Sequence, residues 1–171
     1  MAVKCSQGMG GTTMLQTGRR DKMIQPERHD VYRSRGKYAE PTRCGDCGAV
    51  YEGGRWTWGE APRGAQRAVC PACRRIADRL PAGQVEISGT FFDGHRDEIL
   101  NLVRNAEASE KGERPMERIM GITEAAGRAL VSTTGVHVAR RIGEALARSY
   151  QGALDFRYGA DEDTVRVNWT R

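Results

Sequence analysis

The chain has 171 residues, of which 39% are hydrophobic, 29% are charged and 21 are glycines. This length suits one ordinary domain or two small ones, and the low hydrophobic share argues against a single core that spans the whole chain. No apolar run approaches the ~18–20 residues of a membrane-spanning helix, so we expect no membrane partner.

Positive charge is concentrated in the first half of the chain. Residues 1–83 contain 15 lysines and arginines against 8 acidic residues, whereas residues 84–171 contain 12 against 14. Most of the basic residues are arginines, whose planar guanidinium suits phosphate groups and base stacking. The imbalance favours an anionic partner such as a nucleic acid, and the alternative is a basic surface that only confers solubility.

Residues 1–40 are predicted to form a flexible basic tail. Apolar residues are too sparse there to offset the entropy cost of ordering the segment alone. We expect the tail to become ordered along a phosphate backbone, with Tyr32 and Tyr38 available to stack on bases. Cys5 also lies in this segment, and we interpret it as a free thiol without a role.

Two cysteine pairs follow, each with two residues between its members. Cys44-Gly-Asp-Cys47 and Cys70-Pro-Ala-Cys73 are separated by 22 residues. This spacing predicts one structural Zn²⁺ held by four thiolates, with Gly45 and Gly48 allowing the tight turn. Two disulfides would need an oxidising compartment, but no apolar leader follows Met1, so we expect a cytoplasmic protein. A thioredoxin-like redox pair would use only one such motif.

The predicted zinc-ribbon module covers residues 41–83. Two short strands are expected on either side of Gly53-Gly54, with Trp56 and Trp58 on the same face. One or both tryptophans would pack against the zinc site, and the alternative is exposure for base stacking. A short helix is expected over residues 72–80, with Ile76 and Leu80 facing inward, before a break at residues 81–83.

Residues 84–171 are predicted to form a second unit with clearer periodicity. We expect a strand over residues 85–92 and a helix capped by Asp93 that ends near Gly112. A hairpin (122–125 and 129–134), a helix (136–150) and two strands (154–158 and 165–169) follow. This order matches a ferredoxin-like α+β sandwich with an extra edge strand, so the predicted fold class of the chain is α+β.

Motifs for catalysis are missing from the sequence. It contains no phosphate-binding loop of the Gly-x-x-x-x-Gly-Lys-Ser/Thr type, no dinucleotide-binding glycine motif and no Gly-x-Ser-x-Gly elbow. The histidines, His29, His95 and His137, are scattered along the chain. His95 near Asp93 and Asp97 is the one acid–base alternative, against an ordinary exposed histidine. We therefore expect no catalytic residues, no small-molecule substrate and no enzymatic activity.

The order of motifs resembles a known family. The paired cysteines, an arginine-rich helix, Gly89-Thr-Phe-Phe92, and the later Ala139-Arg-Arg-Ile-Gly-Glu-Ala-Leu146 helix resemble the start of the Nmd-three-type export adaptors of the ribosomal large subunit. The chain also looks like a small bacterial group of uncharacterised proteins with the same layout. The resemblance covers about residues 44–158 and implies zinc ligation by the four cysteines and binding to the large subunit. The chain lacks the later domains of the eukaryotic members, so export is not implied.

These observations predict a zinc-stabilised, non-enzymatic RNA-binding protein that associates with ribosomal RNA, in subunit assembly or on idle ribosomes under stress. The residues expected to contact RNA are basic side chains and one tryptophan: Arg19, Arg20, Lys22, Arg33, Arg35, Lys37, Arg43, Arg55, Trp58, Arg63, Arg67, Arg74, Arg75, Arg140, Arg141 and Arg148. Tyr51 is a second candidate for stacking. The alternatives are a zinc-ribbon regulator that binds DNA, a protein–protein adaptor and, last, an enzyme.

Overall fold

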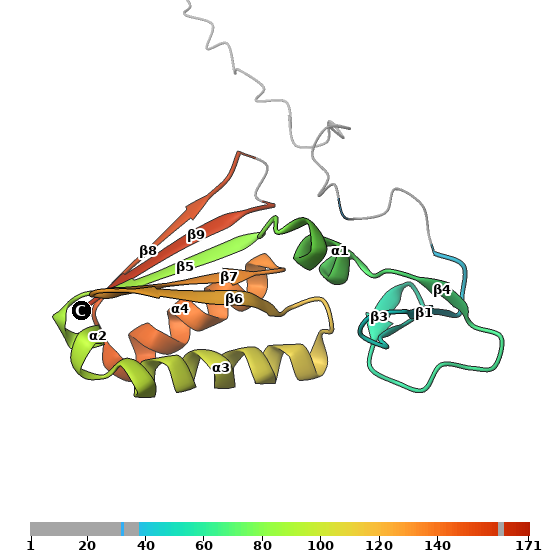
Figure 1. Ribbon diagram of the computed structural model, residues 1–171, viewed down its shortest axis with the longest axis horizontal. Coiled ribbons are helices and arrows are strands. Elements are labelled where there is room, and N and C mark those ends of the chain that lie inside the picture. The colour runs from blue at the N-terminus through green and yellow to red at the C-terminus, as the bar shows by residue number, and fades with distance from the viewer. Residues whose placement is uncertain (1–31, 33–37, 161–162) are drawn as a thin grey trace, which may run out of the picture.

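The structure is a computed structural model that describes Tyr32, residues 38–160 and residues 163–171 (Figure 1). It contains a four-stranded sheet near the start of the described chain and a five-stranded sheet with helices after it. The mixed α and β content predicted from the sequence is confirmed. The predicted tail residues Arg19, Arg20, Lys22, Arg33, Arg35 and Lys37, together with Cys5, lie outside the described residues.

The first sheet belongs to the cysteine-rich module and has the order β3-β2-β1-β4. Its strands are all short: β1 (Thr42–Cys44), β2 (Val50–Glu52), β3 (Arg55–Thr57) and β4 (Gln66–Ala68). β1 and β2, and β2 and β3, pair antiparallel, whereas β1 and β4 pair in parallel. Gly53 and Gly54 both have positive φ, and their N–H groups donate to the Glu40 carboxylate, which explains the tight β2–β3 turn.

An aromatic cluster supports one side of this sheet. The ring of Tyr38 contacts Tyr51 and Trp56, each with centroids 5.2 Å apart. Trp56 also packs against the buried cysteines, which confirms the prediction that at least one tryptophan packs at the proposed zinc site. The prediction that Tyr51 stacks on a base is wrong, because only 8% of Tyr51 is exposed. Tyr38 was predicted to lie in the tail, yet it packs as part of the module.

Helix α1 (Pro71–Asp78) follows the second cysteine pair. It begins with Cys70 as N-cap and Pro71 in the first turn, and it ends where Arg79 adopts a left-handed conformation. The prediction that Ile76 and Leu80 face inward is wrong, because they are 38% and 55% exposed. In a helix of two turns the inner face is already filled by Ala72, Cys73 and Arg75.

The second unit is built on a five-stranded sheet with the order β6-β7-β5-β9-β8. Its strands are β5 (Gly83–Ser88), β6 (Ile119–Ala125), β7 (Arg128–Thr133), β8 (Ala153–Tyr158) and β9 (Val165–Thr170). The β6–β7 hairpin and the β8–β9 pair confirm two sequence predictions. The last strand, β9, lies inside the sheet, parallel to β5, so the extra edge strand is β8. The ferredoxin-like classification stays a prediction.

Three helices accompany this sheet: α2 (Thr90–Gly94), α3 (Arg96–Glu113) and α4 (Val136–Tyr150). α4 has the predicted bounds. The longer helices α3 and α4 lie together along the same face of the sheet (Figure 1). Between this face and the helices lies an apolar core in which Trp169, Phe92 and Ile142 are fully buried. Along β5, β7 and β9 buried and exposed residues alternate, and the face away from the helices is mainly polar, with Leu130 exposed on it.

The junction of β5 and α2 departs from the predictions. A strand was expected through Phe92, but β5 ends at Ser88, and Phe91 and Phe92 belong to α2. Gly89 has φ +112° and lies so close to the Arg171 backbone that an added Cβ would be 2.1 Å from its carbonyl oxygen. This turn starts α2 early, so the prediction that Asp93 caps the long helix is wrong: α3 begins after His95, which makes no side-chain cap.

Candidate metal centre

Four cysteine sulfurs converge between β1 and α1. The Sγ atoms of Cys44 and Cys73 are 3.9 Å apart, and those of Cys47 and Cys70 are 3.7 Å apart. All four sulfurs lie within 4.8 Å of one another. Tetrahedral zinc with bonds near 2.3 Å places its sulfur ligands roughly 3.7 Å apart, so the spacing fits such an ion.

Two local turns position these sulfurs. Cys44 ends β1, and the chain then turns so that the Gly48 N–H donates to the Cys44 carbonyl, with φ +79° at Gly48. The need for glycine at position 48 is therefore confirmed. At Gly45 the prediction is wrong, because its φ is not positive and an added Cβ would meet no atom within 4 Å. The second pair belongs to the N-terminus of α1, where Cys70 is the cap and Cys73 lies in the first turn.

Backbone N–H groups donate to two of the sulfurs. The N–H of Cys70 donates to Cys44 Sγ at 3.3 Å, and that of Cys73 donates to Cys70 Sγ at 3.4 Å. Burial acts to raise the pKa of Cys44, but hydrogen bonds from backbone N–H groups outweigh it and lower that pKa to about 7. Burial raises the pKa of the Cys70 and Cys73 thiols. Positive charge at the centre is therefore needed to hold all four as thiolates.

The α/β unit supplies a cation to this centre. Nη2 of Arg118, in the loop between α3 and β6, donates to Cys70 Sγ at 3.4 Å and to Cys73 Sγ at 3.5 Å. Met116 of the same loop packs against the cysteine cluster. Burial acts to lower the pKa of Arg118, but the sulfur contacts outweigh it and raise that pKa. Arg118 was not predicted as a site residue, because nothing in the local sequence pattern distinguishes it from the other arginines.

The chemistry of the four sulfur donors indicates which ion the site can hold. Four soft sulfur donors at tetrahedral spacing fit zinc, and hard cations such as Mg²⁺ or Ca²⁺ prefer oxygen ligands. Cys44 and Cys70 are fully buried, and Cys73 is 8% exposed. With all four positions filled by protein, an ion here would cross-link β1 to α1 and leave no open position for water or substrate.

The arginines predicted to contact RNA fall into two groups. In the cysteine-rich module Arg43, Arg55, Arg63, Arg67 and Arg74 are exposed. Within the described residues, none of these five takes part in an ion pair. Trp58 is 39% exposed, and its Nε1–H donates to the Lys111 carbonyl near the end of α3.

Of the remaining predicted arginines, Arg75 is buried, Arg140 and Arg141 form ion pairs, and Arg148 is exposed. Arg75 is only 6% exposed, with its guanidinium 4.5 Å above the ring of Tyr32, so the prediction of a surface phosphate contact there is wrong. On α4, Arg141 pairs with Glu110 at 2.9 Å and Arg140 with Glu144 at 3.5 Å. Arg148 is exposed near the end of the same helix.

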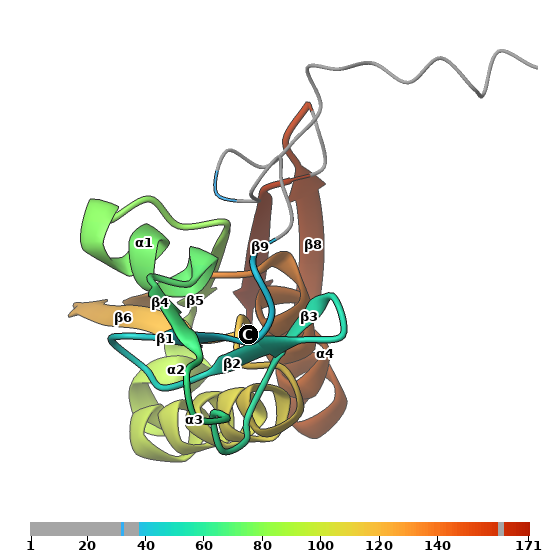
Figure 2. The ribbon, with the colours of Figure 1, turned by 90° about the vertical axis from the view of Figure 1, so that its right-hand side faces the viewer.

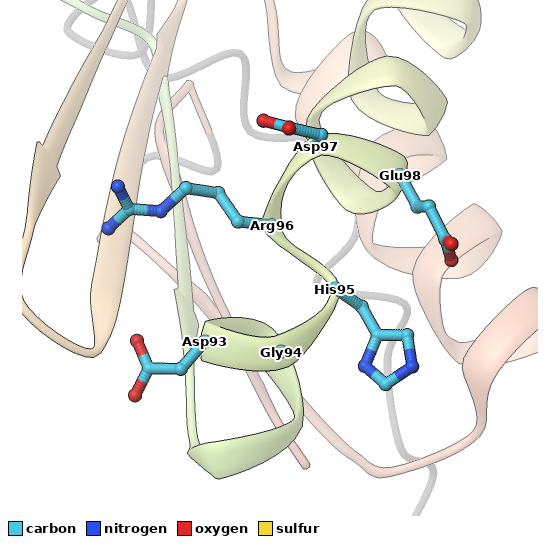
Figure 3. Close-up of a pocket in the computed structure, with 6 residues that line it drawn as sticks. All are labelled: Asp93, Gly94, His95, Arg96, Asp97 and Glu98. Atoms are coloured by element: carbon cyan, nitrogen blue, oxygen red, sulfur yellow. The ribbon is translucent and has the colours of Figure 1, made fainter.

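An open pocket at the α2–α3 junction is lined by residues 93–98, including His95 (Figure 3). The side chains of Asp93, His95 and Arg96 point in different directions. The His95 ring stacks on Phe91 with centroids 3.9 Å apart, and its Nδ1 lies 3.0 Å from the Phe91 carbonyl oxygen. His95 therefore packs locally, and no acid–base pair with Asp93 or Asp97 is formed here.

No helix in the described part of the chain is long and apolar enough to cross a bilayer. No protein-family model matches this chain, and no curated protein or solved structure shows significant similarity to it. The functional interpretation therefore depends on the residues of the chain itself.

Proposed function

We propose that this chain is a zinc-stabilised, non-enzymatic RNA-binding protein of the cytoplasm that associates with the ribosome. The four-cysteine centre would hold β1, α1 and the connecting turns rigid. The exposed arginines of that module would then meet phosphate groups at fixed positions, with little ordering cost on binding.

The observation that supports this proposal best is a pair of like charges on neighbouring strands. Arg43 of β1 and Arg67 of β4 are register partners, so both side chains leave the same face of the sheet. Both are exposed, and neither has an acidic partner among the described residues. Like charges directly opposite each other destabilise a sheet, and a bound phosphate would turn this repulsion into attraction.

Charge outside the module is part of the proposal. Residues 38–80 contain seven arginines and five acidic residues, whereas residues 1–37 contain eight basic and three acidic ones. Four thiolates around a divalent ion would remove about two positive charges from the module. We therefore assign recognition of a fixed phosphate arrangement to the module and most of the general attraction to residues 1–37.

The ribosome is proposed as the partner on two grounds. Structured RNA offers phosphates at fixed positions and unpaired bases, which suit the exposed arginines and the exposed Trp58 of the module. The resemblance to the Nmd-three-type adaptors favours the large subunit, in assembly or on idle ribosomes.

Sedimentation and nuclease treatment test this proposal. In a sucrose gradient of cell lysate, the protein should move with ribosomal subunits, and RNase but not DNase should release it. Its affinity for purified ribosomal RNA should fall steeply with salt, because each neutralised phosphate contributes about −0.7 to −0.9 to the slope of log K against log salt. Release by DNase alone would indicate a DNA-binding regulator, and slow sedimentation with salt-independent binding to a protein would indicate an adaptor.

A further inference from the structure

One loop connects the cysteine centre to the α/β unit. Residues 114–118 lie between α3 and β6, and in Figure 2 the small sheet is seen in front of the α/β unit. From this loop Arg118 donates to two cysteine sulfurs, and Met116 packs on the cysteine cluster. In the opposite direction Trp58 donates to the carbonyl of Lys111, one of the last carbonyls of α3, which have no partner within the helix.

Arg118 has an unusual environment for a surface-loop arginine. It is 8% exposed, and among the described residues no carboxylate lies within ion-pair distance. Its Nε–H is buried without a hydrogen-bond partner in that part of the chain. The cysteine sulfurs are therefore its counter-charge. A buried guanidinium without an anion is strongly unfavourable, so docking of this loop requires thiolates on the other side.

The thiolates in turn need a donor such as Arg118. Four thiolates and one divalent cation carry a net charge of about −2, which is costly in a buried site unless donors surround the sulfurs. Two backbone N–H groups meet part of this need, and Arg118 adds a full positive charge. Groups that hydrogen-bond to metal ligands commonly change metal affinity by about 10–100-fold when they are removed.

We propose that Arg118 is a positioning residue for the metal centre, and that its contact with the thiolates couples metal occupancy to the docking of the zinc module on the α/β unit. This inference rests on the zinc centre of the proposed function and not on RNA binding. Loss of the ion would remove the cross-link that holds Cys70 and Cys73 in place, and with it the fixed pair of sulfurs to which Arg118 donates.

The effect would reach beyond the centre. The carboxylate of Glu117, next to Arg118, accepts a hydrogen bond from the Val138 N–H at the start of α4. Thr134 donates from its hydroxyl to the Met116 carbonyl. A loop released from the metal centre would therefore also loosen the N-terminal end of α4.

Cobalt binding by the full chain tests the coupling. Co²⁺ reports thiolate coordination by its absorption spectrum, and competition with a chelator gives its affinity. Arg118→Met, which removes the charge and keeps most of the bulk, should weaken Co²⁺ binding by about 10–100-fold. Arg114→Met is the control, because Arg114 lies in the same loop but its side chain is 53% exposed and pairs with Glu110. An affinity for Arg118→Met within about twofold of the Arg114→Met value would overturn the proposal.

Hydrogen exchange on the wild-type chain gives a second test that needs no variant. Amides of residues 111–119 and of the first turn of α4 should exchange at least about tenfold faster after zinc is removed with a chelator, because docking is lost. Unchanged exchange there would overturn the coupling even if Arg118→Met failed to fold. A wild-type chain that binds no cobalt would overturn the metal centre itself. Absence of RNA binding with the coupling intact would overturn only the proposed partner.

Discussion

Replacing both Arg43 and Arg67 with glutamine should weaken RNA binding and make its affinity less dependent on salt. The two residues are register partners on β1 and β4, without acidic partners among the described residues. If each arginine contacts one phosphate, the slope of log K against log salt should be less steep in the double variant by about 1.4 to 1.8. Between 50 and 200 mM salt, the wild type should then lose about seven- to twelvefold more affinity than the variant.

A charge-matched variant separates local contacts from net charge. Arg140→Gln with Arg141→Gln also removes two positive charges, but these arginines already pair with Glu144 and Glu110. Charges more than about 8–10 Å from the RNA are largely screened at physiological salt, so this variant should keep a slope close to that of the wild type. Filter binding to purified ribosomal RNA at four salt concentrations measures both slopes. Equal slope changes in the two double variants would refute the assignment of phosphate contacts to the β1–β4 pair.

Two further predictions concern packing and the metal. Gly143→Ala should destabilise the chain by about 1–3 kcal/mol, because the new methyl would lie 2.6 Å from Cγ1 of the buried Val167. In α3 an added Cβ at Gly112 would meet no atom within 4 Å, so Gly112→Ala should stabilise the chain by up to about 1 kcal/mol. Urea unfolding of both variants measures these changes in the free energy of unfolding. A Gly143→Ala variant more stable than the wild type would contradict the packing described. Zinc affinity should rise between about pH 6 and 8, because burial raises the pKa of the Cys70 and Cys73 thiols and the ion must displace their protons. A zinc affinity independent of pH in competition titrations would mean that these thiols do not bind the ion.

Local periodicity predicted much of the second unit. Residues 136–150 form α4 with the expected bounds, because one apolar stripe runs along a helix of suitable length. The sequence could not show that Ser88 ends its strand, since Phe91 and Phe92 continue the apolar pattern. The close approach of Gly89 to the Arg171 backbone decides the turn, and this contact joins residues far apart in the chain.

The candidate metal centre was also predictable from the sequence only in part. The spacing of the cysteines predicted that the four sulfurs lie together, and they do. Each Cys-x-x-Cys pair is recognisable because its turn depends only on local geometry. Which arginines stay at the surface was not predictable from their spacing. Arg75 is buried beneath Tyr32, and Arg118, which was not predicted, lies against the sulfurs through a contact with residues 45 and 48 positions earlier in the chain.

Metal content of the purified full-length chain tests the central claim most directly. Elemental analysis and native mass spectrometry should find one zinc ion per chain, lost in Cys70→Ser and retained in Cys5→Ser, which changes a cysteine outside the described residues. A wild-type chain without metal, or a Cys70→Ser chain that keeps its zinc and its stability, would contradict the account.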